Sequence, residues 1–340
     1  MKAVVYDAPR QFAVVEVPTP EPGPGQVRVR VLQTGVCGTD LHLHEGQFLA
    51  AYPMIPGHET VGVIDRMGED VEGFQLGEQV VLNPNSSCGN CSFCREGRPL
   101  MCPDISGLGS NRPGGFAEYV VAPVELVFSA AGMHPDTAVF TEPTACAIHG
   151  LGVVRPTPGS TALVLGAGPT GLLLAQLLAS SGAAYVTVAA PVELQLKRAE
   201  ALGIDATYHM DRDHLSRDVA NLLARSGGAG YDTVVDATGV ARVGEACVSL
   251  TRSGGTALLY GVADENDRIQ VSPYEVFRRE LTIKGSFAEI DTFPAALAAL
   301  RSGRVRTDNI ITHRFSLDEY GDALGALRDG TAVHKVVVAP

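Results

Sequence analysis

The first 145 residues alternate apolar and polar side chains over short stretches. Valine-rich runs such as QVRVRVLQTG (26–35) and VGVIDRMG (61–68) are broken by proline and glycine. A period of two predicts half-buried strands, and the closely spaced turn residues predict that neighbouring strands pair antiparallel. This part of the chain is expected to form a β-rich, barrel-like domain.

From Gly159 the pattern changes to repeated units of an apolar run, a turn and a helix-like segment. The strand-like runs are 161–168, 185–190, 231–239 and 256–262, and the helix-like segments are 169–183, 193–203 and 241–250. Alternation of strands and helices predicts a doubly wound parallel sheet. The expected fold class is therefore α/β, with a β-rich domain followed by this sheet.

One apolar run, 161–180, is about as long as a membrane-spanning helix. Pro169 and the glycines Gly166, Gly168 and Gly171 interrupt it in the middle. A buried strand, a turn and a buried helix in succession give the same hydropathy, so we interpret the run in that way.

The segment beyond residue 286 holds two helix-like stretches (292–303 and 315–330) and a final apolar strand (334–340). This segment is too short to bury a core of its own, so it is expected to complete the first domain. The predicted domains are residues 1–147 with 288–340, and residues 148–287.

Composition and charge limit the partners of the protein. The 340 residues carry 26 Lys and Arg against 38 Asp and Glu, a formal net charge of −12, with no basic block. Such a chain lacks the positive surface that holds phosphate backbones, so no nucleic-acid partner is expected. The N-terminus alternates like a strand and lacks the apolar core of a signal peptide, which predicts a cytoplasmic location without membrane association.

Four of the seven cysteines are regularly spaced, in CGNCSFCREGRPLMC at 88–102. Closely spaced cysteines in a cytoplasmic chain are more often metal ligands than disulfides. Four thiolates complete a closed tetrahedral zinc shell with no position left for a substrate. Cys88, Cys91, Cys94 and Cys102 are therefore predicted to hold a structural zinc ion that fixes a loop.

The glycine turn GAGPTG (166–171) follows an apolar strand and opens a helix-like segment. In that setting the three glycines allow a tight turn, a close approach of a pyrophosphate and the packing of helix on strand. The sequence therefore predicts a dinucleotide site. Its expected cofactor-binding residues are Gly166, Gly168, Pro169, Thr170, Gly171, Thr238 and Gly261.

Ala190 stands at the end of the second strand of this domain, where an Asp or Glu would bind the ribose hydroxyls of NAD. Loss of the acid removes the repulsion that excludes a 2′-phosphate, and Lys197 and Arg198 lie downstream as possible cations. Glu193 lies nearer and opposes them. The pattern favours NADP slightly and leaves NAD open.

A second set of metal ligands lies in GVCGTDLH (35–42) and GHE (57–59). Cys37, His58 and an acid from farther along the chain would hold zinc with one open position, which lets zinc act as a Lewis acid. Zinc in a chain that also binds a hydride cofactor indicates alcohol oxidation or carbonyl reduction.

These motifs together resemble a known family. GVCGTDLH, GHETVGVIDRMGEDV (57–71), the four-cysteine segment, GGFAEY (114–119) and GAGPTG follow in the order typical of the zinc-containing medium-chain alcohol dehydrogenases. The resemblance covers essentially the whole chain. It implies a GroES-like catalytic domain interrupted by a Rossmann domain, two zinc ions, NAD or NADP, and a homodimer or homotetramer with residues 256–262 as a possible edge strand.

The resemblance also implies roles for individual residues of the catalytic domain. The corresponding catalytic zinc ligands are Cys37, His58 and Glu142. Glu59 matches a residue that joins or leaves the zinc shell. Thr39 matches the hydroxyl that takes the alcohol proton, and His42 matches the histidine that passes this proton towards solvent.

Glutamate as the third ligand resembles the branch of sorbitol, threonine and glucose dehydrogenases, and it implies a polyol or sugar-like substrate. Sorbitol dehydrogenases carry a tyrosine and an arginine–tyrosine pair where this chain has Leu43, Ala288 and Glu289, so sorbitol itself is not indicated. Glu289 and Asn83 are candidate partners for substrate hydroxyls. A threonine-type amino-alcohol dehydrogenase and a non-catalytic zinc- and nucleotide-binding protein are the alternatives.

Overall fold

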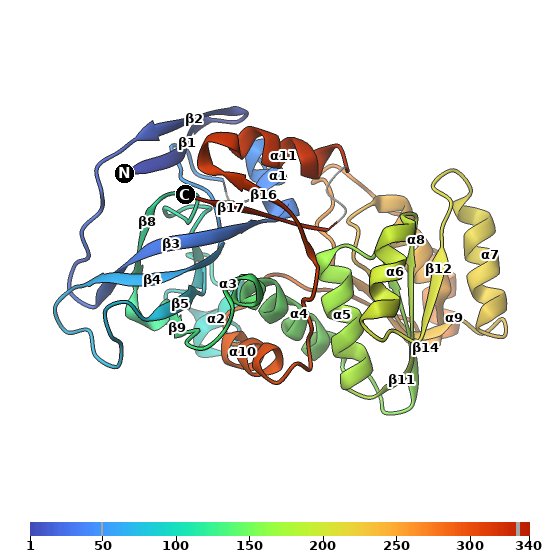
Figure 1. Ribbon diagram of the computed structural model, residues 1–340. Coiled ribbons are helices and arrows are strands. Elements are labelled where there is room, and N and C mark those ends of the chain that lie inside the picture. Colours follow the sequence, from blue (N-terminus) through green and yellow to red (C-terminus); the bar gives the residue numbers. More distant parts are fainter. Residues whose placement is uncertain (49, 331–333) are drawn as a thin grey trace. The chain divides into compact units, whose positions relative to one another are not determined.

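The computed structural model describes residues 1–48, 50–330 and 334–340. The chain folds into two compact units (Figure 1). Unit 1 comprises Met1–Ala145, Glu289–Ser302 and Thr307–Pro340, and unit 2 comprises Cys146–Ala288 and Gly303–Arg306.

Unit 1 contains a sheet of strand order β16-β17-β3-β4-β5-β9, with β8 also paired to β3. Its strands are β3 (Gln26–Val36), β4 (Glu59–Met67), β5 (Gln79–Leu82), β8 (Tyr119–Pro123), β9 (Val127–Ser129), β16 (Ile311–Ser316) and β17 (Lys335–Ala339). Every pair is antiparallel except β16 with β17. Figure 1 shows β17, near the C-terminus, beside β3 from the N-terminal part of the chain.

Strand β3 shows why the alternating pattern predicts this sheet. Val27, Val29 and Val31 are buried in one hydrophobic cluster. Arg28 and Arg30, between them in the sequence, are not buried and lie on the opposite face. Side chains two residues apart share a face of a strand, so one face is apolar and the other meets solvent.

The other elements of unit 1 are mostly short. They are β1 (Lys2–Ala8), β2 (Gln11–Glu16), α1 (Gly38–His44), β6 (Asn85–Ser86), α2 (Ser92–Arg95), η1 (Pro99–Met101), β7 (Ser106–Gly107), η2 (Val124–Leu126), α3 (Pro135–Ala138), α10 (Phe293–Arg301), η3 (Leu317–Glu319) and α11 (Tyr320–Arg328). Helix α4 (Thr141–Val154) runs from unit 1 into unit 2.

Unit 2 is a doubly wound sheet of six parallel strands in the order β12-β11-β10-β13-β14-β15. The strands are β10 (Ser160–Leu165), β11 (Ala183–Ala190), β12 (Ala206–His209), β13 (Tyr231–Asp236), β14 (Thr251–Leu259) and β15 (Thr282–Gly285). The helices are α5 (Pro169–Ser180), α6 (Glu193–Ala201), α7 (Leu215–Arg225), α8 (Ala241–Leu250) and α9 (Pro273–Arg279). This strand order is that of the Rossmann fold, and the α/β prediction is confirmed.

Two details of the sequence interpretation are settled in unit 2. The apolar run 161–180 forms β10, a turn and α5, as predicted. Residues 256–262 do not provide an edge strand, because β14 lies between β13 and β15. The edge strand on this side of the sheet is β15, which lacks the long apolar run that marks a buried parallel strand. Within the described residues, no helix is long and apolar enough to cross a membrane.

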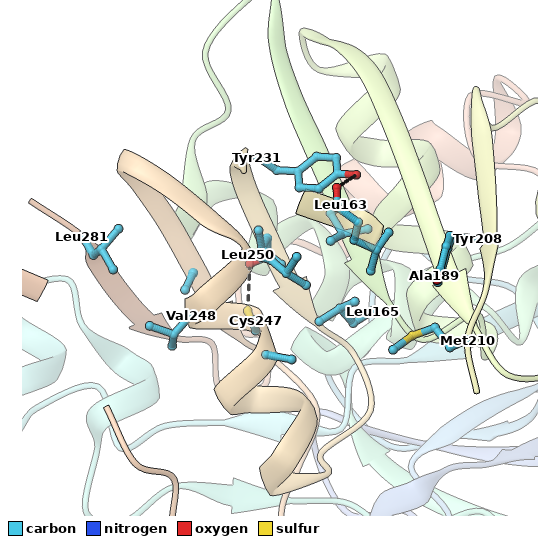
Figure 2. Close-up of a cluster of buried hydrophobic side chains, with 14 residues drawn as sticks. Leu163, Leu165, Ala189, Tyr208, Met210, Tyr231, Cys247, Val248, Leu250 and Leu281 are labelled. Atoms are coloured by element: carbon cyan, nitrogen blue, oxygen red, sulfur yellow. Dashed lines mark hydrogen bonds between the residues drawn. The ribbon is translucent and has the colours of Figure 1, made fainter. Parts of the chain in front are cut away.

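The core of unit 2 is formed by side chains of the sheet and the helices that cover it (Figure 2). Leu163 and Leu165 of β10 are fully buried there. Cys247 of α8 is also fully buried, and its thiol donates a hydrogen bond to the carbonyl oxygen of Val234 (3.3 Å). Cys247 is therefore a packing residue.

We predict that Leu165→Ala lowers the free energy of unfolding by about 2–5 kcal/mol, because it removes buried apolar surface and leaves a cavity. Leu194→Ala is the control, since Leu194 is 52% exposed, and its effect should stay within about 0.5 kcal/mol. Urea unfolding followed by circular dichroism measures both. Equal effects for the two variants would contradict the assignment of this core.

Candidate active site

Three metal-ligating side chains meet where β3 ends and β4 begins. Cys37 follows β3, His58 immediately precedes β4, and Glu59 is the first residue of β4. The two strands are antiparallel neighbours, with Gly35 opposite Glu59. Strand pairing therefore brings together residues far apart in the sequence, and one ligand atom from each of the three lies within 4.8 Å of the others.

Asp40 supports two of these side chains. It lies in α1 and is buried, and its Oδ2 accepts a hydrogen bond from the backbone N–H of Cys37 (2.8 Å). Its Oδ1 lies 3.7 Å from Nδ1 of His58. One carboxylate thus fixes the backbone of Cys37 and faces the ring of His58, which is how outer-shell groups orient metal ligands.

A buried ion pair joins Glu59 to Lys335, the first residue of β17. The side chains of Lys335 and Glu59 are 4% and 0% exposed. Gly35 makes room for the pair, because a Cβ at this position would collide with the Glu59 carboxylate. The Oε1 of Glu59 is buried and has no hydrogen-bond partner among the described residues.

The electrostatics of this group favour a cation. Burial alone would lower the pKa of His58, but Asp40 and Cys37 together raise it well above its usual value. Burial likewise opposes the charge on Lys335, and Glu59 with Cys37 raises its pKa nevertheless. With a thiol, an imidazole and an unpartnered carboxylate oxygen close together, the residues fit a zinc ion.

Glu142, the predicted third zinc ligand, lies in the first turn of α4 and is 8% exposed. It is close enough for its charge to raise the pKa values of His58 and Lys335. The compact three-residue group nevertheless contains Glu59 rather than Glu142. Two carboxylates are thus available to this site.

Thr39 and His42, the predicted proton carriers, lie three residues apart in α1, so their side chains are neighbours on the helix surface. The hydroxyl oxygen of Thr39 lies 3.7 Å from Sγ of Cys37. Nδ1 of His42 lies 2.8 Å from Oε1 of Gln47. With the amide oxygen of Gln47 as acceptor, Nδ1 carries the proton and Nε2 is the ring's acceptor.

The four clustered cysteines also meet. Their sulfur atoms lie within 4.8 Å of one another, and Sγ of Cys91 is 3.5 Å from Sγ of Cys94. The backbone N–H of Cys91 points at the sulfur of Cys88 (3.4 Å). Backbone N–H groups of Asn90 and Cys91 lower the pKa of Cys88 to about 7. A thiol set of this kind fits a closed zinc shell.

The glycine turn of unit 2 lies between β10 and α5. No side chain caps the N-terminus of α5, so its first N–H groups stay available to an anion. A Cβ on Gly171 would collide with the backbone oxygen of Gly166, which explains glycine there. At Gly168 the space beyond the backbone is open. These features fit a bound pyrophosphate.

The other predicted cofactor residues lie mainly at the carboxyl ends of the strands of unit 2. Ala190 ends β11 and is fully buried, and Gly261 follows β14 with its backbone against that of Thr238. The hydroxyl of Thr238 is already bonded to Oδ1 of Asp236 (2.6 Å). Lys197 lies in α6 instead, 65% exposed and 3.8 Å from Glu193.

Asn83 and Glu289, the two predicted partners for substrate hydroxyls, differ in how far their polar atoms are already hydrogen-bonded within the protein. The side chain of Asn83 donates to the carbonyl oxygen of Ile290 (2.8 Å) and accepts from the N–H of Asn85 (2.9 Å), so it serves the local backbone. Glu289 is fully buried; its Oε2 accepts from the hydroxyl of Thr292 (3.1 Å), whereas its Oε1 has no partner among the described residues.

Sequence reasoning missed Lys335 and the contact of Asp40 with His58. Lys335 is a lone lysine at the start of the apolar strand KVVVA, and its strand position was the only available indication. Its partner lies far away in the sequence, so the pairing is visible only after the sheet has formed.

Comparison with known proteins agrees with this geometry. The family "Alcohol dehydrogenase GroES-like domain" matches residues 23–132, and the family "Zinc-binding dehydrogenase" matches residues 169–302. The chain is 40% identical to D-arabinitol dehydrogenase 1 of Uromyces fabae over 343 residues, which covers 100% of this chain and 97% of the relative.

Two further proteins are similar along most of their length. D-altritol 5-dehydrogenase of Agrobacterium fabrum is 37% identical over 328 residues and covers 94% of both chains. A solved structure of a zinc-binding dehydrogenase from Sinorhizobium meliloti 1021, bound to NADP, has a TM-score of 0.90 and 33% identity, with 100% of this chain and 99% of the other covered. The chain belongs to the zinc-containing medium-chain alcohol dehydrogenases.

We predict that Lys335→Met lowers the free energy of unfolding by about 3–5 kcal/mol, because it leaves the carboxylate of Glu59 buried without its counter-charge. Lys2→Met is the matched control: its pair with Asp318 (2.8 Å) is exposed, and its loss should change the free energy of unfolding far less. Glu59→Gln added to Lys335→Met should restore part of the loss. Equal effects of Lys335→Met and Lys2→Met would show that the pair is not buried.

We predict a pH effect at Glu289. Burial, and then the charge of Glu142, raise the pKa of Glu289 to about 8 from a usual value of 4.5. The folded state then keeps a proton that the unfolded chain releases, so this group's contribution to stability falls as pH rises between these two values.

From about pH 6 to about pH 8, the contribution of Glu289 should fall by about 2 kcal/mol, and Glu289→Gln should remove this fall. Glu72→Gln, an exposed control, should keep the wild-type pH dependence. Urea unfolding at several pH values measures it. A Glu289→Gln profile parallel to that of the wild type would refute the prediction.

Proposed function

We propose that the protein is a zinc-dependent, NAD(P)-linked dehydrogenase that oxidises a secondary alcohol of a polyol or reduces the corresponding ketone. The main observation behind this proposal is the candidate zinc site, in which Cys37, His58 and Glu59 lie together with Glu142 nearby. The same chain has the glycine turn of a dinucleotide site in unit 2. Relatives named D-arabinitol and D-altritol dehydrogenase support a polyol as the substrate class.

The residues present support the following proposed roles. Cys37, His58 and Glu142 would hold the catalytic zinc, with Glu59 as an exchangeable ligand. When bound, zinc lowers the pKa of a coordinated hydroxyl, and the nicotinamide accepts the hydride from the alcohol carbon. The chain itself must orient the substrate and remove its proton.

Two residues of α1, Thr39 and His42, would remove the proton of the alcohol. The hydroxyl of Thr39 lies beside the sulfur of Cys37 and would take the alcohol proton. His42, one turn further along α1, offers Nε2 as the next acceptor while Gln47 holds Nδ1. A hydroxyl alone is a weak base, so the imidazole of His42 supplies the next proton acceptor.

The second metal site has a structural role in this proposal. Cys88, Cys91, Cys94 and Cys102 would hold a second zinc ion, and its role would be structural because four thiolates leave no open position for a substrate.

The seven cysteines form no disulfide among the described residues, which supports the cytoplasm as the proposed location.

The proposed assembly is a homodimer or homotetramer that pairs through β15, one of the two edge strands of unit 2. An open strand edge offers unpaired N–H and C=O groups to a second copy. Apolar side chains are exposed nearby: Ile283 of β15 is 37% exposed, and Tyr274 and Phe277 of α9 are 64% and 81% exposed.

We predict about two zinc ions per chain. Cys37→Ala should leave about one and abolish turnover while the fold is kept, since Cys37 belongs to the open site. Cys91→Ser, the matched variant in the other cluster, should also leave about one but mainly lower the thermal midpoint. Elemental analysis, circular dichroism and activity measure these effects. An active Cys37→Ala enzyme would refute the catalytic assignment.

The function is tested by nicotinamide reduction in the zinc-loaded protein with arabinitol, altritol, sorbitol, aldoses, simple alcohols and threonine, each with NAD and NADP. Turnover fastest with a polyol is the expected result. Preference for threonine would replace the polyol assignment with an amino alcohol. No turnover, with zinc and nucleotide both bound, would favour a binding protein.

A further inference from the structure

The strand next to β11 brings a second set of side chains to the position of the missing acid. Strands β11 and β12 are parallel, and Ala190 stands opposite His209 in their register. The N–H of Met210 donates to the carbonyl oxygen of Ala190 (3.0 Å). The end of β12 therefore lies directly beside the residue that, in this fold, adjoins the adenosine ribose.

The alternation of side chains places His209 on the same face as Ala190. Tyr208 and Met210, on either side of His209, belong to the buried cluster that also contains Ala189. Because successive side chains of a strand point to opposite faces, His209 and Ala190 lie on the other face. His209 is exposed there.

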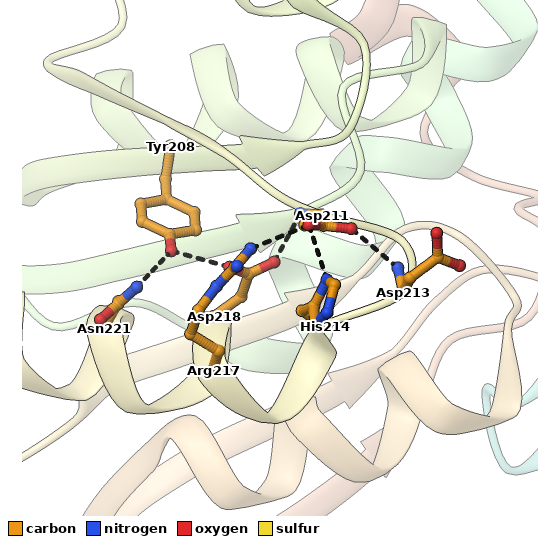
Figure 3. A network of polar contacts seen from close by, with 7 residues as sticks. All are labelled: Tyr208, Asp211, Asp213, His214, Arg217, Asp218 and Asn221. Atoms are coloured by element: carbon orange, nitrogen blue, oxygen red, sulfur yellow. Dashed lines mark hydrogen bonds and ion pairs between the residues drawn. The ribbon is translucent and has the colours of Figure 1, made fainter.

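A polar network fixes the loop that follows β12 (Figure 3). Asp211 lies at its centre: its carboxylate accepts from the backbone N–H of Asp213 (2.9 Å), and pairs with His214 (2.8 Å) and Arg217 (3.0 Å). These contacts lower the pKa of Asp211 to about 2, beginning with the bond from the backbone N–H of Asp213. Asp211 is therefore ionised and engaged within the loop at neutral pH.

A residue of helix α7, Asp218, holds the same loop through further contacts. Asp218 is 1% exposed, and its two oxygens accept from the hydroxyl of Tyr208 (2.9 Å) and the backbone N–H of Asp211 (2.6 Å). Both acids are thus occupied by fixed internal contacts. The loop that carries Arg212 is tied to β12 and α7 at several points.

Arg212 is the free cation of this loop. It is exposed and makes no hydrogen bond or ion pair through its side chain with residues 1–48, 50–330 or 334–340 of the structure. Asp213 adjoins it in sequence and weakens the local positive potential. Lys197, one of the two cations that the sequence suggested together with Arg198, has Glu193 one helical turn away at 3.8 Å.

We propose that Arg212, assisted by His209, binds the 2′-phosphate of NADP and sets the cofactor preference, and that Lys197 does not. The inference rests on the proposed nicotinamide-linked function, and it adds the residues that recognise the adenosine ribose of the cofactor. An arginine guanidinium presents two parallel donors to a phosphate, whereas an exposed lysine with a nearby carboxylate is a screened point charge. Ala190 does not repel the 2′-phosphate, because it has no carboxylate.

Calorimetric titration of the zinc-loaded protein with two probes tests this proposal. Adenosine 2′,5′-bisphosphate and adenosine 5′-monophosphate differ only at the 2′ position. Arg212→Ala should weaken binding of the bisphosphate about 10- to 100-fold and change binding of the monophosphate less than about twofold. His209→Asn should weaken only the bisphosphate, by a smaller factor. Arg212→Lys should fall between Arg212→Ala and the wild type.

Two variants serve as controls. Lys197→Ala should leave both affinities unchanged, and Asp213→Asn should strengthen binding of the bisphosphate because it removes a neighbouring negative charge. Equal loss of both probes in Arg212→Ala would place Arg212 against the adenine or the 5′-phosphate and overturn the proposal. A bisphosphate-specific loss in Lys197→Ala would overturn it as well.

Failure of this inference is distinguishable from failure of the proposed function. A wild type that binds the two probes equally and oxidises a polyol with NAD refutes the role of Arg212 and keeps the dehydrogenase assignment. The predicted probe pattern without oxidation of any alcohol refutes the dehydrogenase assignment and keeps the 2′-phosphate site. In the expected case, Arg212→Ala retains NAD-linked turnover and loses NADP-linked turnover.

Discussion

The buried pairing of Glu59 with Lys335 is the interaction on which the catalytic unit depends. It joins the start of β4 to the first residue of β17, so the C-terminal strand is held against the strand that carries a metal ligand. Two charges removed from water are tolerated only when each has its partner. Lys335 holds Oε2 of Glu59, which leaves Oε1 as the oxygen that a metal ion could bind. Oε1 has no hydrogen-bond partner among the described residues.

Around this pair the site is organised by an excess of negative charge. Asp40, Glu59 and Glu142 surround one thiol and one imidazole, and a single buried lysine offsets them. Such surroundings favour a divalent cation because it satisfies several anionic groups at once. Asp40 also orients two of these groups, since it accepts a hydrogen bond from the backbone of Cys37 and faces the ring of His58.

The cofactor site of unit 2 follows a different principle. Its main requirement is room for a pyrophosphate at the N-terminus of α5, and glycines provide that room. Discrimination between cofactors depends on what surrounds the ribose, at the ends of β11 and β12. Because parallel strands place their carboxyl ends side by side, the loop after the neighbouring strand β12 can replace a residue missing from β11.

The sequence by itself determined the fold class and most of the candidate ligands. Alternating valines predict the sheet of unit 1, and the glycine turn after an apolar strand predicts the start of α5, because both depend on local periodicity and backbone sterics. Cysteine spacing likewise predicts a metal shell from four nearby residues. These features need no knowledge of distant contacts.

Only the tertiary structure decided which distant groups meet. The pairing of Glu59 with Lys335 joins residues near opposite ends of the chain. The approach of Asp40 to His58 and the register of Ala190 with His209 depend on how neighbouring elements pack together. The same holds for the edge of the sheet beyond β14, which is formed by β15 and not by the more apolar β14. Hydrophobic periodicity specifies which face of a strand is buried but not which strand becomes its neighbour, and that choice depends on packing of the whole sheet.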